Sequence, residues 1–295
     1  MLVEYLIGGY CMELVCNREY DSRAEKITVR FLKNFFYEKM KIFNYKLIND
    51  EERQKTGIDV ILTLNNGMVL NVDNKSANIQ WMNSNLTNFA IELSFLAKEK
   101  DENGNDILLD DGTECRKQVY GWFINPESKT DVYLFYWVHL KEENGFPYSP
   151  NAKKSNYYKY FEYEDIDWIE VSLIEKRVLK SWCKMFDLTD KKLICLNEEL
   201  RNQSIREDGR PTWNRYIRDS HGNKIDGLVG ITKNNSYKER PILLILNHDL
   251  AERLSFMHYV VYPTKIKYLF CSRREKSKKE FLRLKDILKY RNVYS

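Results

Sequence analysis

Two aspartates and a lysine stand close together in the sequence, in a pattern suited to hydrolytic chemistry. Asp73 follows Asp59 by fourteen residues, and Lys75 comes two residues later. Two nearby carboxylates cannot both ionise cheaply without a cation between them, so such a pair either shares a proton or binds a divalent metal. A lysine beside the metal can orient an attacking water or offset the charge that develops on a phosphate. Together the three residues favour metal-dependent phosphodiester hydrolysis.

A predicted β-hairpin would hold these residues together. The apolar runs 60–64 and 68–72 flank Asn65-Asn66-Gly67. An Asn-Gly pair between two β-favouring runs predicts a tight turn joining antiparallel strands. Because side chains alternate along a strand, Asp73 and Lys75 are predicted on one face of the second strand. Two charged residues on one face are unusual in a core, which favours a functional role.

Further elements are predicted around the hairpin from apolar spacing. A helix is expected at 22–40, with Glu25 in its first turn, and a strand at 43–48, which gives the order helix, strand, strand, strand. Residues 88–95 fit a strand, although 79–97 also fit a helical period, and Glu92 could reach the hairpin from either structure. Later strands are predicted at 119–124, 131–138, 166–171, 241–246 and 259–262, and helices at 173–186, 189–203 and up to residue 254.

This arrangement resembles the PD-(D/E)xK superfamily of restriction-endonuclease-like nucleases. The resemblance covers roughly residues 22–140 and rests on Asp59, on Asp73-Asn74-Lys75 and on the preceding helix with Glu25. Ile58 stands where the family name has proline. The resemblance implies an α/β fold with an αβββαβ core, whose mixed, mostly antiparallel sheet is flanked by helices, plus C-terminal embellishments.

The resemblance also implies roles for the residues. Asp59 and Asp73 would bind Mg²⁺, with Mn²⁺ as a substitute, and Lys75 would assist the nucleophilic water. Glu25 would complete the site, and Glu92 is a further candidate metal ligand. The implied activity is that of an endonuclease acting on DNA, in a phage, mobile-element, defence or recombination context. A homodimer is expected by family analogy alone.

Other interpretations remain open. Asp73 and Lys75 also fit an exposed ion pair worth under about 1 kcal/mol, and Glu25 fits a solvated residue whose charge meets the helix dipole favourably. At the level of function, the alternatives are a catalytically silent member of the same fold that binds nucleic acid or protein, an RNA-directed nuclease, and an interaction protein with a polar hairpin.

Basic residues after position 140 are candidates for nucleic-acid contact. Lys153 and Lys154 open a stretch rich in tyrosine, and such mixtures can hold phosphates and stack on bases, although the stretch fits a strand or lid with exposed tyrosines better. The segment 205–240 is predicted to be a loop-rich insertion, and 273–289 a basic amphipathic helix. Arginines bind phosphate oxygens bidentately, and the insertion offers Arg206, Arg210, Arg215 and Arg218.

Composition sets the outer limits. A chain of 295 residues with 43% hydrophobic content can bury a substantial core, and we expect an N-terminal extension at 1–20, a nuclease-like core at 21–186 and a region at 187–295 that packs on or completes that core. The net charge is only +4, so nucleic-acid affinity would have to come from local patches. The N-terminal segment lacks the pattern of a signal peptide or membrane span, so no membrane partner is expected.

The cysteines and histidines show no metal-binding spacing. None of the six cysteines forms a CxxC pair, which predicts reduced thiols in a cytoplasmic protein. The four histidines, at 139, 221, 248 and 258, are dispersed along the chain. A structural or surface role is therefore predicted for each histidine.

Overall fold

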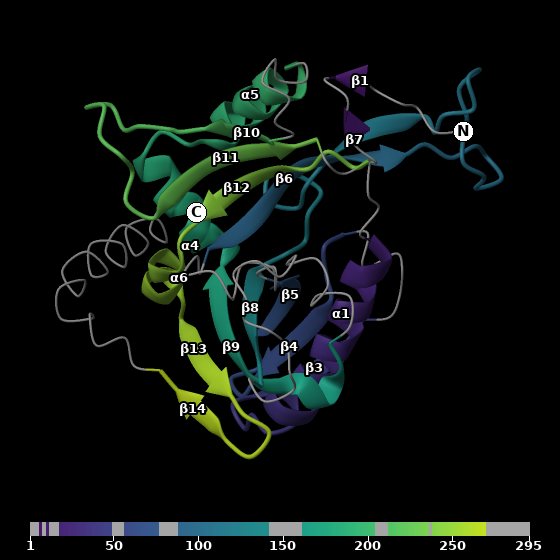
Figure 1. Ribbon diagram of the computed structural model, residues 1–295. Helices are drawn as coiled ribbons and strands as arrows, with labels where there is room; N and C mark the ends of the chain where they lie inside the picture. The colour runs from purple at the N-terminus through teal and green to yellow at the C-terminus, as the bar shows by residue number, and fades with distance from the viewer. Residues whose placement is uncertain are drawn as a thin grey trace.

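Two β-sheets and flanking helices make a mixed α/β fold (Figure 1). The computed structural model describes residues 6–7, 10–11, 18–48, 56–76, 88–141, 161–203, 212–235 and 238–269. In this part of the chain the larger sheet has seven strands, in the order β14 (Ile266–Tyr268), β13 (Met257–Val261), β9 (Ile166–Glu175), β8 (Val132–Leu140), β5 (Val69–Ser76), β4 (Val60–Leu64) and β3 (Phe43–Leu47). The smaller sheet has five, in the order β10 (Thr212–Arg215), β11 (Leu228–Asn234), β12 (Ile242–Leu246), β6 (Phe89–Lys98) and β7 (Arg116–Tyr120). A separate short pair is formed by β1 (Leu6–Ile7) and β2 (Tyr10–Cys11).

The two sheets are interleaved along the chain. Among the described strands, β5 and β8 form the one parallel pair, and all other neighbours are antiparallel. A parallel pair requires a crossover connection. Here the chain between β5 and β8 contributes β6 and β7 to the smaller sheet before it returns. After β12 the chain again changes sheet, through α6 (His248–Leu254), to add β13 and β14 to the larger one.

The predicted β4–β5 hairpin is confirmed. Val60 pairs with Val72 at its open end, and Thr63 pairs with Val69 near the turn. Gly67 in the turn has φ +83°, a left-handed conformation that glycine adopts without steric cost. The strands predicted at 43–48, 88–95 and 131–138 are also present, as β3, β6 and β8.

The helices lie against the sheets. In Figure 1, α1 (Arg18–Leu32) flanks the larger sheet and α5 (Asp190–Arg201) lies along the smaller one. The hydroxyl of Thr189 caps α5 by accepting the N–H of Lys192, and the side chain of Asn247 caps α6 in the same way. None of the helices in the described ranges has the length and apolar character that crossing a bilayer requires. The remaining helical segments are a π-helical turn after α1, η1 (Lys33–Tyr37), the 3₁₀ turn η4 (Tyr163–Asp165) and α4 (Lys176–Met185).

Two hydrophobic cores lie on opposite faces of β8, whose residues 132–138 are all buried. Leu134, Tyr136 and Val138 belong to what we call the helix-side core, with residues of α1, η1, β3, β4 and β5. Tyr133, Phe135 and Trp137 belong to the intersheet core, with residues of β6, β11, β12, α4, α5 and α6. The larger sheet is therefore covered on both faces at β8, which explains the continuous apolar run of that strand.

Several predicted boundaries differ from the structure. The helix predicted at 22–40 begins at Arg18, and its α-helical part ends at Leu32. The strand predicted at 119–124 ends at Tyr120, because Gly121 begins a turn in which its carbonyl accepts the N–H of Ile124 at 3.2 Å. The helix predicted at 173–186 begins only at Lys176. Its first three predicted residues instead extend β9, where they pair with β8.

The C-terminal region also differs from its predicted form. The segment 205–240, predicted to be loop-rich, contains β10 and β11. β10 is a short polar edge strand, and its backbone bonds come from pairing with β11 rather than from any apolar pattern of its own. The predicted basic helix at 273–289 lies outside the described residues.

Candidate functional site

Asp59 is fixed at the entrance to β4. Its N–H donates to the carbonyl of Val72 at 2.9 Å, and its carbonyl accepts the N–H of Ile48 at 2.8 Å. Its carboxylate oxygen Oδ2 accepts the N–H of Asn74 at 2.7 Å. Since Val60 and Val72 are the last regular pair of the hairpin, Asp59 stands where the next pair would place it opposite Asp73.

Asp73 and Lys75 share one face of β5, as predicted. The side chain of Asp73 is only 4% exposed, and its Oδ1 lies 2.9 Å from Nζ of Lys75. The other oxygen, Oδ2, is buried and has no hydrogen-bond partner among the described residues. Burial raises the pKa of Asp73 to about 7, with the lysine opposing the rise and the Asp59 carboxylate adding to it. The carboxylate of this ion pair is therefore buried and its lysine is 27% exposed, unlike the exposed pair of the alternative interpretation.

Glu25 and Glu92 approach the pair from two other elements. Glu25, on α1, is exposed, yet desolvation raises its pKa and repulsion from Asp59 adds to the rise. Glu92, on β6, is half-buried, and desolvation raises its pKa while the charges of Lys75 and Arg201 oppose the rise. The structure thus brings the predicted residues of α1, β4, β5 and β6 into one electrostatic neighbourhood.

Carboxylates outnumber the lysine in this neighbourhood. Burial lowers the pKa of Lys75, but the carboxylates around it outweigh that effect and leave the pKa above its usual value. The lysine therefore stays protonated at neutral pH, and one positive charge faces several carboxylates. Carboxylate oxygens are the ligands that a hard divalent cation prefers, although these carboxylates are not among the described residues whose donor atoms lie close enough together, in a group of three or more, to hold an ion. We call these residues the carboxylate–lysine site, which comprises Glu25, Asp59, Asp73, Lys75 and Glu92.

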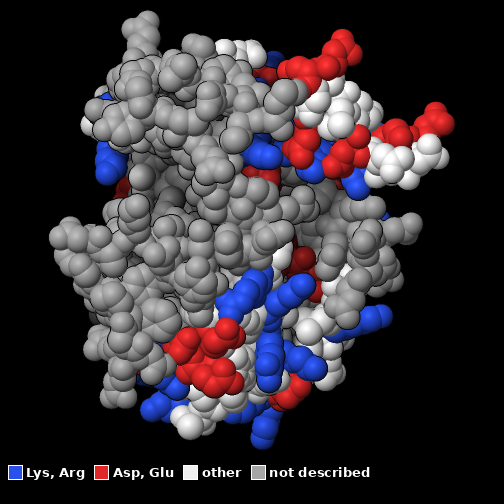
Figure 2. Space-filling model, turned by 45° about the vertical axis from the view of Figure 1, so that its right-hand side comes forward, with Lys and Arg blue, Asp and Glu red and all other residues white. Residues whose placement is uncertain are grey.

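The predicted nucleic-acid contacts are less well placed. Arg215, on β10, forms an ion pair with Glu199, and Arg218 donates to the carbonyl of Gly222 at 2.8 Å. Two strands separate β10 from β6, which carries Glu92. On the face in Figure 2, basic and acidic side chains lie side by side over the described part of the surface. The other predicted contacts lie outside the described residues: Lys153, Lys154, Arg206 and Arg210.

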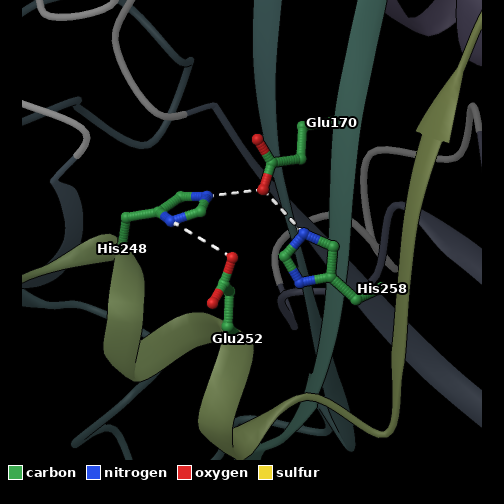
Figure 3. Close-up of side chains that lie close together, drawn as sticks. All are labelled: Glu170, His248, Glu252 and His258. Carbon is green, nitrogen blue, oxygen red and sulfur yellow. Dashed lines mark hydrogen bonds and ion pairs between the residues drawn. The ribbon is translucent and has the colours of Figure 1, made fainter. Parts of the chain in front are cut away.

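A second cluster joins α6 to the larger sheet and could hold a metal ion. Oε1 of Glu170, in β9, lies 2.5 Å from Nε2 of His248 and 2.6 Å from Nε2 of His258. Nδ1 of His248 lies 3.9 Å from Oε1 of Glu252, one helical turn further along α6 (Figure 3). We call these four residues the histidine–glutamate cluster.

Hydrogen bonds and opposite charges hold the residues of the cluster together. Burial would raise the pKa of Glu170, but hydrogen bonds from His248 and His258 lower it to about 2. Burial would lower the pKa of His248, but the partner carboxylate raises it above its usual value. Glu170 is therefore ionised at neutral pH, where it accepts hydrogen bonds from both imidazole rings.

The sequence prediction missed this cluster, because its members lie far apart in the chain. His248 and His258, for which a structural or surface role was predicted, meet at one glutamate, and the sequence did not indicate this meeting. His139 stacks on Trp168, and His221 lies exposed in a turn, so those two fit the prediction. One signal was present in the sequence: His248 and Glu252 have the i, i+4 spacing that places two ligands on one helix face.

Comparison of the chain with protein-family models, with curated proteins and with solved structures gave no match. The geometry of the two clusters therefore carries the functional argument. Of the two, the carboxylate–lysine site contains a combination suited to catalysis.

Proposed function

We propose that the protein is a Mg²⁺-dependent endonuclease of the PD-(D/E)xK type that hydrolyses phosphodiester bonds of DNA. One observation carries the proposal: the carboxylates of Asp59 and Asp73 and the ammonium of Lys75 meet at the open end of the β4–β5 hairpin. The strand order within the larger sheet agrees with it in part: β3, β4 and β5 are antiparallel neighbours, and β8 lies beside β5 and parallel to it, although β6 and β7 of the smaller sheet come between β5 and β8 in the chain.

The residues fit a magnesium ion. Oδ2 of Asp73 is buried without a hydrogen-bond partner among the described residues, and such an oxygen is costly unless a cation or proton satisfies it. The other oxygen of the same carboxylate holds Lys75. Asp73 can therefore bind a metal through one oxygen and keep its lysine through the other. Asp59 would supply the second carboxylate, and Glu25 and Glu92 would orient water or further ligands.

The chemistry divides between the metal and the lysine. When bound, Mg²⁺ would lower the pKa of a water and polarise the scissile phosphate. Lys75 holds its ammonium on the same strand face as Asp73, where it would position the attacking water. In the reaction the water gives up a proton to solvent and its oxygen bonds to phosphorus as the bond to the leaving oxygen breaks. The leaving oxygen takes up a proton from solvent, and the lysine charge offsets the negative charge that develops on the phosphate.

Cleavage of supercoiled plasmid tests the proposal. Wild type should nick or linearise the plasmid with Mg²⁺ or Mn²⁺ and not with EDTA. Lys75→Ala should lower the rate by about 100-fold or more, while Lys46→Ala, at an exposed lysine of β3 in the same sheet, should leave it unchanged. Lys75→Arg keeps a positive charge that can pair with Asp73. If this variant folds as wild type does but cleaves slowly, Lys75 acts in catalysis and not only in stability. Circular dichroism checks the folding of each variant.

The outcomes distinguish the alternatives. Cleavage of RNA alone would indicate an RNA-directed nuclease. The absence of cleavage on plasmid, single-stranded DNA and RNA would indicate a catalytically silent member of the fold. Cleavage that survives both Lys75 substitutions would refute the assignment of the site.

A further inference from the structure

The histidine–glutamate cluster lies where the chain passes from β12 of the smaller sheet to β13 of the larger sheet. The chain leaves the smaller sheet at the end of β12, forms α6 and enters the larger sheet as β13. His248 and Glu252 lie on α6, His258 lies in β13, and Glu170 lies in β9, the strand that pairs with β13. The four side chains converge from the three elements in Figure 3. A single ligand bound by all four side chains would attach α6 to β9 and β13 of the larger sheet.

The donor atoms suit a four-coordinate divalent ion. The cluster offers two imidazole nitrogens and two carboxylate oxygens, all within 4.8 Å of one another. Tetrahedral zinc with bonds of about 2.0–2.1 Å places its ligand atoms about 3.3 Å apart. One imidazole ring can offer only one nitrogen to an ion, and Nε2 of His248 and Nε2 of His258 lie 2.5 and 2.6 Å from Oε1 of Glu170, closer than that value. Glu252 lies 3.9 Å from the other nitrogen of His248, Nδ1. Rotation of the Glu170 and Glu252 side chains would therefore be needed to admit the ion.

Both imidazole rings are oriented by other side chains. Nδ1 of His258 lies 3.0 Å from Oγ of Ser172, a buried contact that directs Nε2 of the same ring toward Glu170. The ring of His248 meets Trp137 edge-on, with centroids 4.8 Å apart. Metal-binding histidines commonly donate their second nitrogen to such an outer partner, which fixes the orientation of the ring. The cluster is thus organised before any metal arrives.

The ligand types and their burial discriminate among metals. Imidazole suits zinc and its neighbours, whereas Mg²⁺ prefers oxygen ligands in octahedral geometry. The side chains of Glu170, His248 and His258 are 12%, 14% and 7% exposed, and Glu252 is 32% exposed. A divalent ion would balance both carboxylates and leave the two imidazoles neutral. Four protein ligands leave no open position, which is characteristic of a structural site.

We propose that Glu170, His248, Glu252 and His258 bind one Zn²⁺ ion, which fastens α6 to the larger sheet. The site is separate from the carboxylate–lysine site, because β8 lies between β9 and β5 in the sheet. The proposal does not depend on the nuclease activity.

Metal content and thermal stability of the full chain test the proposal. The protein is stripped with a chelator, dialysed and supplied with Zn²⁺, and bound metal is measured by mass spectrometry. Wild type should retain one zinc per chain and melt at a higher temperature with zinc than without it. Co²⁺ in place of zinc should give the visible absorption of a tetrahedral site.

Single substitutions locate the ligands. Glu252→Gln and His248→Ala should each weaken zinc binding by about 100-fold or more, and Ser172→Ala by about 10–100-fold. His221→Ala, at an exposed histidine in a turn, is the matched control and should bind zinc as wild type does. Glu252→Gln changes the most exposed member of the cluster and keeps its size, so this variant tests binding even where His248→Ala does not fold.

Two results would overturn the proposal. One is wild-type protein that retains far less than one zinc per chain after dialysis. The other is Glu252→Gln protein that binds zinc as tightly as wild type. Asp73→Asn should retain zinc whether or not the protein cleaves DNA, which keeps the two proposals separable.

Discussion

Replacing Asp73 with asparagine should stabilise the metal-free protein at neutral pH. The Asp73 carboxylate is buried, one of its oxygens lacks a partner among the described residues, and the Asp59 carboxylate faces it. Asparagine has nearly the same shape and no charge, and its carbonyl oxygen can still accept from Lys75. The substitution therefore removes the cost of a buried charge while it keeps most of the packing.

The magnitude follows from the shift in pKa. Folding raises the pKa of Asp73 from 3.8 to about 7, about 3 units at about 1.4 kcal/mol each, or an upper value of about 4 kcal/mol. Because the folded state binds this proton more tightly, the contribution to stability is complete below about pH 4 and is lost as the pH rises through about 7. We expect Asp73→Asn to gain about 2–4 kcal/mol over wild type at about pH 8, and little at about pH 4.

Urea denaturation at these two pH values, with EDTA, measures the effect. Asp167→Asn, at an exposed aspartate of β9, is the matched control and should change the free energy of unfolding by less than about 0.5 kcal/mol. Adding Mg²⁺ should stabilise wild type at the higher pH, by about 2.7 kcal/mol at 100 times its dissociation constant, and should stabilise Asp73→Asn much less. An asparagine variant that is no more stable than wild type at about pH 8 would refute the burial argument.

Three further predictions concern other parts of the fold. Burial lowers the pKa of His139, which stacks on Trp168, to about 4. The ring proton resonance of His139 should therefore titrate near that pH in NMR spectra. Its contribution to the free energy of unfolding is present above the unfolded pKa of 6.5 and should be lost as the pH falls through about 4. Gly121→Ala should lower the free energy of unfolding by about 2 kcal/mol or more in urea, because the added Cβ would lie 2.0 Å from the carbonyl oxygen of Glu92. Arg201→Met should lower the free energy of unfolding by about 1–3 kcal/mol in the same assay. The guanidinium of Arg201, in α5, donates hydrogen bonds to Ser94, to Gln118 and to the carbonyl of Arg240, and these are lost. The amides of α5 should also lose protection in hydrogen exchange.

Local patterns in the sequence predicted the hairpin and its charged face well. The Asn-Gly turn sets the register, and the period of two then places Asp73 and Lys75 on one face. These features depend on residues close in the chain, so a sequence can reveal them. The contribution of Glu92 depends on β6 of the smaller sheet, and its strand conformation was ambiguous from periodicity alone.

Features that depend on distant pairing could not be predicted. β10 is strand because it pairs with β11, and residues 173–175 are strand because β8 lies beside them. The histidine–glutamate cluster joins residue 170 to residues 248–258, and no local pattern connects these segments. The one local signal, the spacing of His248 and Glu252, also occurs in many helices as a simple ion pair.

The burial of β8 on both faces has a consequence for the unfolded chain. Residues 132–138 read Val-Tyr-Leu-Phe-Tyr-Trp-Val, seven apolar or aromatic residues with no charge, proline or glycine. Such a segment favours intermolecular β-pairing whenever it is exposed. In the native fold two cores hide it, so the same strand that holds the sheets together would drive aggregation once they separate. Heating without denaturant should therefore give irreversible unfolding, whose apparent midpoint depends on the scan rate.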